Sequence, residues 1–309
     1  MVSYKGNGSY CYSNSASMLL STISEEVSPS LIEVLTGFSL GASIEDGLLF
    51  FDNSVTSPDV AINAAFHSLG FSVNERVSKD GGELPLEEFS KVLSDSPIMV
   101  GPVDMGFLTY LPNHKYLSGS DHYVLALEMN NNEVLLHDPH GYPFVSLPLN
   151  QLDLAWKSDK IQCRKGPYHY WFSPKKESDL SEDEIFLRAI KNFKTIYINQ
   201  EKVARESKVL FGREAINIKA NEFRNKKITD REMSHLIYFA FPVSARRSQD
   251  FAKYFNNREV LISTLKEKQS RLFGKCQTLA TQGRLEAVGD TLEILADIEE
   301  QIKDAILKL

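Results

Sequence analysis

The chain has 309 residues, enough for about two domains, and its hydrophobic (42%) and charged (24%) fractions are those of an ordinary globular protein. The formal net charge is −7 and no long basic run occurs, which excludes the charge pattern of a nucleic-acid-binding protein. No apolar run is long enough to span a membrane, no signal peptide is visible, and the cysteines (Cys11, Cys163 and Cys276) are too widely spaced for a disulfide framework or a CxxC metal pair. We therefore expect a cytoplasmic protein with no membrane or nucleic-acid partner.

A short glycine-rich loop near the N-terminus leads directly into Cys11 and then into a helical pattern. Four apolar residues recur at helical spacing after the cysteine: Ala16, Leu19, Leu20 and Ile23. Ser13 and Asn14 suit a helix start, because their short polar side chains satisfy free backbone N–H groups. A thiol at this position lies at the positive end of the helix dipole, which favours the thiolate. The pattern predicts a nucleophilic cysteine, whereas a cysteine taken alone is more often a small buried hydrophobic residue.

The region that follows alternates predicted helices with short predicted strands. The helices are expected at 28–35, 60–69 and 86–93, and the strands at 48–51, 71–73 and 98–104, with a glycine-punctuated loop at 37–47. The last of these strands is apolar and ends in Asp104. This carboxylate either binds the amine of a substrate or forms hydrogen bonds to a neighbouring loop, and the pattern leaves both alternatives open.

Two strand-like runs, 123–128 and 133–138, flank three consecutive asparagines, and this pattern predicts a β-hairpin. If the hairpin is centred on Asn130 or Asn131, His122 lies opposite Asp138 or one diagonal away, on the same face of the sheet. A two-residue turn would break this parity, so the expectation depends on the loop. The hairpin alone therefore predicts a histidine–carboxylate pair.

The composition changes near residue 175, beyond the aromatic segment 168–172, which we assign to a core strand or the domain interface. Helices are predicted at 181–198, 200–224, 229–255, 257–281 and 284–308. Pro242 is expected to kink its helix. Arg246 and Arg247, which follow it, are either surface residues or bind the phosphate of a phosphopantetheine arm. A heptad-like apolar run closes the domain or forms a homodimer, and its members are Leu285, Val288, Leu292, Leu295, Ile298, Ile302 and Ile306.

These residues supply the parts needed for nucleophilic catalysis. Cys11 would be the nucleophile, His122 the general base and acid, and Asp138 the group that orients the histidine. A lone histidine is more often structural, so the expectation depends on the combination of the three residues. His114, His137 and His140 are expected at the surface or in loops. A metal site at His137, Asp138 and His140 is disfavoured, because the spacing is local and no fourth ligand is evident, and we expect no bound metal or cofactor.

The order of cysteine, histidine and aspartate, with the segments Asp121–Leu127 and Leu135–Gly141, resembles the papain-like superfamily, and within it the branch of the double-glycine leader peptidases of bacteriocin exporters. Tyr10-Cys11, the segment Pro97–Leu108 and the helical C-terminal half are most similar to the butirosin biosynthesis protein H family. The resemblance implies transfer of an acyl group to an amine of a small natural product through an acyl-cysteine. The implied donor is an acyl-phosphopantetheine thioester, presented by an acyl carrier protein or as acyl-CoA.

The sequence departs from that branch at one position. The peptidases carry a glutamine six residues before the cysteine, whose side chain helps to form the oxyanion hole, and this chain has Lys5 there. Asn7 is a candidate to supply an amide donor beside the backbone N–H of Cys11, and it is otherwise a turn residue. We expect an α+β fold: a papain-like catalytic domain with an antiparallel sheet at 1–175, followed by an all-α domain at 176–309. The alternatives are a papain-like peptidase or amidohydrolase, and an inactive binding or scaffold protein with this fold.

Overall fold

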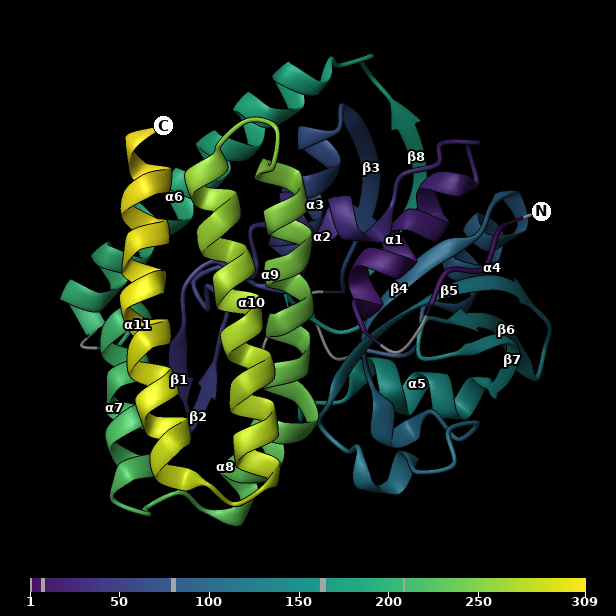
Figure 1. Ribbon diagram of the computed structural model, residues 1–309. Coiled ribbons are helices and arrows are strands. Elements are labelled where there is room, and N and C mark those ends of the chain that lie inside the picture. The colour runs from purple at the N-terminus through teal and green to yellow at the C-terminus, as the bar shows by residue number, and fades with distance from the viewer. Residues whose placement is uncertain (1, 7–8, 79–81, 162–164, 208) are drawn as a thin grey trace. The chain divides into compact units, whose positions relative to one another are not determined.

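The computed structural model describes residues 2–6, 9–78, 82–161, 165–207 and 209–309 and divides into two compact units (Figure 1). Unit 1 comprises residues 1–32 and 57–180, and unit 2 comprises residues 33–56 and 181–309. The predicted boundary at 175 lies close to the second division of the chain. The prediction that residues 33–56 belong to the first domain is wrong, because they pack with the C-terminal helices. The first division falls inside α2 (Pro29–Thr36).

Unit 1 is built on a six-stranded sheet in which all neighbouring strands are antiparallel. The strand order is β3-β8-β4-β5-β6-β7. The strands are β3 (Phe71–Arg76), β4 (Ile98–Asp104), β5 (Asp121–Met129), β6 (Glu133–Asp138), β7 (Tyr142–Pro148) and β8 (Tyr170–Lys176). Every residue of β4 is buried, as its run of apolar and β-branched residues predicts. The predicted α+β class and antiparallel sheet are confirmed, whereas β7 was not predicted.

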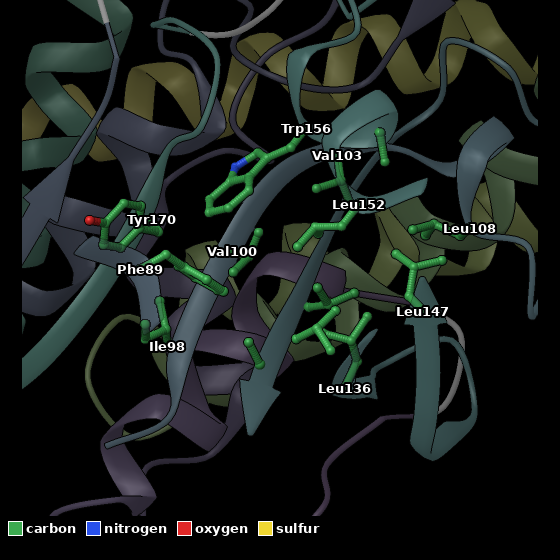
Figure 2. Close-up of a cluster of buried hydrophobic side chains, with 14 of the residues drawn as sticks. Phe89, Ile98, Val100, Val103, Leu108, Leu136, Leu147, Leu152, Trp156 and Tyr170 are labelled. Carbon is green, nitrogen blue, oxygen red and sulfur yellow. The ribbon is translucent and has the colours of Figure 1, made fainter. Parts of the chain in front are cut away.

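Helices pack against this sheet and enclose the core of unit 1. They are α1 (Cys11–Ser21), α3 (Pro58–Ser68), α4 (Leu86–Asp95) and α5 (Leu149–Lys157), with short 3-10 turns η1 (Met105–Phe107) and η2 (His114–Tyr116). Figure 2 shows Phe89 of α4 and Trp156 of α5 packed with side chains of the sheet, and the two rings meet edge to face at 5.1 Å. α1 packs against β5 and is buried from Tyr12 to Leu20. The strand that carries His122 and the helix that begins at Cys11 therefore belong to one packed structure.

Unit 2 is a helical assembly with a small two-stranded sheet. The strands are β1 (Ser43–Glu45) and β2 (Leu48–Phe50), and the helices are α6 (Glu182–Ser207), α7 (Gly212–Arg224), α8 (Asp230–His235), α9 (Phe241–Phe255), α10 (Val260–Thr281) and α11 (Leu285–Lys308). Helices α9, α10 and α11 lie side by side (Figure 1). Two expectations are wrong: β1 lies within the predicted loop 37–47, and α6 runs past the predicted break near 199.

Near Pro242, where a kink was predicted, the structure has a π-helical segment, η3 (Leu236–Ala240), directly before α9. Proline cannot donate a backbone hydrogen bond. In the segment before it, the backbone hydrogen bonds have the wider i to i+5 spacing of a π-helix. Arg247 is not a surface residue as expected. Its side chain is buried, lies over the Phe38 ring at 5.0 Å and donates from Nε to Glu33 Oε1 at 2.7 Å. A buried guanidinium paired in this way is not available to a phosphate.

The apolar run along α11 is buried within unit 2, as the first of the two alternatives predicts. Val288, Leu292 and Leu295 are buried in a core cluster with side chains of α7, α9 and α10. Of the helices in the part of the chain that the structure describes, none is long and apolar enough to cross a membrane.

Candidate active site

Cys11 is the first residue of α1, and the residue before it has an unusual backbone conformation. Tyr10 lies in the left-handed region with φ of 64°, which costs a non-glycine residue roughly 1–2 kcal/mol. The Asn14 amide donates to the backbone oxygens of Ser9 (2.7 Å) and Tyr10 (2.9 Å) and so holds this turn. The expectation that Ser13 and Asn14 cap the helix is wrong, because both lie inside its first turn. Cys11 is left partly exposed at the positive end of an otherwise buried helix.

His122 and Asp138 lie next to each other on the β5–β6 hairpin. Leu125 pairs with His137 across the hairpin. This register places Asp138 diagonal to His122 on the same face, as predicted. The asparagine connection alone does not produce this result, because the pairing next to it, Met129 with Val134, has the opposite parity, and a register shift between Ala126 and Glu128 restores the predicted one. The two side chains are buried, and His122 Nε2 lies 2.6 Å from Asp138 Oδ1. The pairing of histidine and aspartate is therefore built by local chain geometry.

The charges of this pair follow from its surroundings. Burial lowers the pKa of the His122 imidazole, but the Asp138 carboxylate and the Cys11 side chain raise it more strongly, to about 10. Burial alone would raise the pKa of the Asp138 carboxyl, yet the charge of His122 and its hydrogen bonds hold that pKa below its usual value. At neutral pH the pair is an imidazolium beside a carboxylate.

The Cys11 side chain hydrogen-bonds to the His122 ring. Because Nε2 of the ring faces Asp138, Nδ1 is the nitrogen left for the sulfur. An imidazolium and a helix N-terminus both favour the thiolate form of a neighbouring cysteine. The arrangement can therefore attack an electrophilic carbon through Sγ and exchange a proton through Nδ1.

Asp138 is also held by groups that the sequence analysis did not single out. The Tyr110 hydroxyl donates to Oδ2 at 2.7 Å, and the His140 backbone N–H donates to Oδ1 at 2.7 Å. The Tyr4 hydroxyl donates to the Asp138 backbone oxygen at 2.8 Å and accepts from the Gly141 N–H at 3.0 Å. The two tyrosines are 28 and 134 residues from Asp138 in sequence, so no local spacing could reveal them.

Lys5 occupies the sequence position of the peptidase glutamine, and its side chain is bonded to residues other than the thiol. Lys5 Nζ lies 2.7 Å from Glu26 Oε2 and donates to Ser17 Oγ at 3.0 Å. Ser17 is six residues beyond Cys11 on α1, about 9 Å along the helix axis. Lys5 therefore does not take the place of the peptidase glutamine beside the thiol. Asn7 lies outside the described residues. The backbone N–H of Cys11 belongs to the first residue of α1, where an N–H has no intrahelical acceptor.

Asp104, the predicted substrate-binding carboxylate, is fully buried and bonded to neighbouring loops. Its Oδ1 accepts from the N–H groups of Gly106 (2.8 Å) and Gly119 (2.9 Å), and its Oδ2 accepts from Ser158 Oγ (2.8 Å). Of the two alternatives, the geometry matches the bond to a loop, because the carboxylate is fully buried and accepts these three hydrogen bonds. His137 also differs from the expectation, since it is buried between the rings of Tyr4 and Phe144.

The remaining sequence candidates do not add a second site. Cys276 is buried in the core of unit 2, where burial raises the pKa of its thiol to about 12. Cys163 lies outside the described residues. Among the residues that the structure describes, no group of three or more His, Cys, Asp or Glu side chains is placed to hold a metal ion.

The fold and the site define a mixed α+β protein with a cysteine–histidine–aspartate cluster in one unit and a helical second unit. A family model described as the YobF C-terminal domain matches residues 206–307, which lie in unit 2. The chain is also 43% identical to the uncharacterized protein YobF of Bacillus subtilis (strain 168), over 310 residues that cover all of this chain and 99% of that protein. The chain belongs to the YobF family.

Proposed function

We propose that this protein is a cysteine-dependent acyltransferase with a papain-like catalytic unit. One observation carries the proposal: the His122 ring hydrogen-bonds to the partly exposed Cys11 on one side and to the buried Asp138 on the other. A nucleophile, a proton-transfer group and an orienting group are thus connected in the order that acyl transfer requires. A helix that begins at the nucleophile and packs on an antiparallel sheet carrying the histidine supports the papain-like assignment.

The proposed reaction has two halves that share an acyl-enzyme. In the first, the Cys11 thiolate attacks the carbonyl carbon of an acyl thioester, the C–S bond of the donor breaks, and the His122 imidazolium protonates the departing thiolate. In the second, an amine attacks the acyl-cysteine, neutral His122 takes the proton of the amine, and Cys11 leaves as the thiolate. The Cys11 N–H, with the Asn7 amide as a second donor, would bind the carbonyl oxygen in both halves.

The substrate classes come from the resemblance to the butirosin biosynthesis protein H family. The donor is an acyl-phosphopantetheine thioester on a carrier protein or coenzyme A, and the acceptor is an amine of a small natural product. A thiolate chemistry of this kind fits the reducing cytoplasm. Hydrolysis by the same three residues differs only in that water replaces the amine. An experiment must therefore distinguish transfer of the acyl group to an amine from its hydrolysis.

Intact-protein mass spectrometry tests the proposal directly. The protein is mixed with acetyl-, hexanoyl- and benzoyl-N-acetylcysteamine, quenched in acid and weighed. We expect one acyl group per chain, mapped to Cys11, absent in Cys11→Ala and retained in Cys276→Ala. Adding primary amines should convert the adduct into an amide, and loss of the adduct in buffer alone at the same rate would indicate a hydrolase. Absence of any adduct at Cys11 with all three thioesters would overturn the proposal.

A further inference from the structure

The loop between β4 and β5, residues 105–120, brings one side chain to the candidate site. Tyr110 lies in this loop, and its hydroxyl donates to Asp138 Oδ2 at 2.7 Å. The other carboxylate oxygen, Oδ1, faces His122 Nε2 and also accepts from the His140 N–H. Tyr110 thus binds the carboxylate at the oxygen opposite the one that serves the histidine.

The position of Tyr110 is determined by the way its loop is fastened. The Asp104 carboxylate binds the backbone N–H groups of Gly106 and Gly119 near both ends of the loop. The Met105 N–H donates to the Ser120 backbone oxygen at 3.0 Å, and this hydrogen bond joins the two ends of the loop. Two residues that flank the tyrosine, Leu108 and Leu111, are buried in the core cluster of unit 1. The tyrosine hydroxyl is therefore held in place before any substrate binds.

We propose that Tyr110 is a positioning residue for His122, which it serves by fixing the rotation of the Asp138 carboxylate. The inference rests on the proposed function, because it assigns a role toward the Cys11–His122 pair. The terminal torsion of an aspartate is broad, so a carboxylate held at one oxygen can turn. With Oδ2 fixed by Tyr110, Oδ1 stays directed at Nε2, and the imidazolium that stabilises the thiolate keeps its partner.

The groups that surround this contact come from several elements. Asp138 faces His122 on β5, the Tyr110 loop, and Tyr4 from the N-terminal segment. Tyr110 faces Asp138 and the Tyr142 ring, whose centroid lies 6.1 Å from its own. Burial and the neighbouring Asp138 charge raise the pKa of Tyr110 well above its usual value, so the hydroxyl stays a donor throughout the range in which a cysteine–histidine pair titrates.

The test is the pH dependence of Cys11 alkylation by iodoacetamide in the full-length chain, followed by peptide mapping. Tyr110→Phe removes only the hydroxyl. We expect the alkylation rate at pH 6 to fall about three- to tenfold and the acidic limb of the profile to move to higher pH by about half a unit to one unit. The matched control is Tyr116→Phe in the same loop, whose side chain is 91% exposed and whose profile should not change.

A second variant tests the loop without touching the tyrosine. Ser158→Ala removes one of the bonds to Asp104, and its profile should move in the same direction by a smaller amount. If the profile of Tyr110→Phe superimposes on that of the natural protein, the role of Tyr110 is refuted while the proposed function stands. If the acidic limb of Cys11 in the natural protein lies at about 8.5, as for a free thiol, the thiolate–imidazolium pair does not exist, and both proposals fail.

Discussion

Unit 1 contains two buried histidines paired with carboxylates, and they differ in one respect. His122 lies 2.6 Å from Asp138, and His169 lies 2.6 Å from Glu75 and 3.4 Å from Asp59. The two rings are buried to a similar degree, with 3% and 0% of their surfaces exposed. Burial and a carboxylate partner, the two features most often used to select a functional histidine, do not distinguish them.

The second ring nitrogen distinguishes them. His169 Nε2 bonds to Glu75, which also accepts from Lys165 at 2.6 Å, and its Nδ1 lies 3.4 Å from Asp59 Oδ2 without a hydrogen bond, so both nitrogens face carboxylates and neither is bonded to a thiol. His122 has one nitrogen at a carboxylate and shares the other with a partly exposed thiol. We interpret the His169 cluster as a link between α3, β3 and the segment before β8. A histidine becomes a candidate for catalysis when its second nitrogen serves a nucleophile that a substrate can reach.

Replacing each histidine by glutamine gives the largest expected contrast. His122→Gln removes the proton-transfer group and should slow acylation of Cys11 by about 10²–10⁴-fold. His169→Gln removes the ring that lies between Asp59 and Glu75 and should lower the free energy of unfolding by about 1–3 kcal/mol, with no change in acylation. Burst-phase mass spectrometry gives the rates and urea unfolding gives the stabilities.

An effect of His169→Gln on acylation would contradict this comparison of the two histidines. If His169→Gln slowed acylation as strongly as His122→Gln while both variants remained folded, the His169 cluster would have a role in the chemistry. The network from Tyr123, which donates to Asp59 Oδ1 at 2.6 Å, would then be the route to examine.

The charge of the His122–Asp138 pair predicts a pH dependence of stability. The pKa of His122 is raised in the folded protein to about 10 from about 6.5, so its contribution is complete below pH of about 6.5 and is lost as the pH rises through about 10. The folded pKa of Asp138 is lowered, so its contribution is present above its unfolded pKa and is lost in acid.

Asp138→Asn should therefore be less stable than the natural chain by about 1.5–3 kcal/mol at pH 7, and the difference should shrink toward pH 10 and toward acid. Urea titrations of both proteins from pH 3 to pH 10 measure it, and groups that titrate equally in both proteins cancel in the difference. A stability gap that does not vary with pH would show that the pair is not ionised.

The part of the site that is local in sequence was partly predictable. The three asparagines predict the hairpin that carries His122 and Asp138, but the register next to them would put the two residues on opposite faces, and a register shift between Ala126 and Glu128, which was not predicted, brings them to one face of the sheet. The helix that begins at Cys11 was predictable from its apolar spacing. Its capping was not, because the turn depends on the left-handed Tyr10 and on the Asn14 amide reaching back to it.

The parts that depend on distant contacts were not predictable. Tyr110 and Tyr4 reach Asp138 from separate loops, and no periodicity marks a loop tyrosine as a ligand of a carboxylate. Arg247 looked like a surface residue because its partner, Glu33, is 214 positions away. Residues 33–56 were assigned to the wrong domain for a similar reason: their apolar side chains Leu49 and Phe51 are buried among the helices of unit 2, which are distant in sequence. Long-range packing decides such cases, and a single sequence does not contain it.

The smallest expected effect is at Lys5, where the sequence differs from the leader peptidases. Its ammonium is bonded to Glu26 and Ser17, and the Glu26 side chain is 66% exposed. Lys5→Ala should lower the free energy of unfolding by about 0–1 kcal/mol, as for other exposed ion pairs, and should leave acylation of Cys11 unchanged. Unfolding in urea and the mass-spectrometric burst measure both. A strong loss of acylation at normal stability would contradict this, since it would require the lysine to leave Glu26 and reach Cys11 during the reaction. An unchanged rate would mean that the side chain of residue 5 does not bind the carbonyl oxygen in the proposed reaction, which leaves the N–H of Cys11 as the first donor to test.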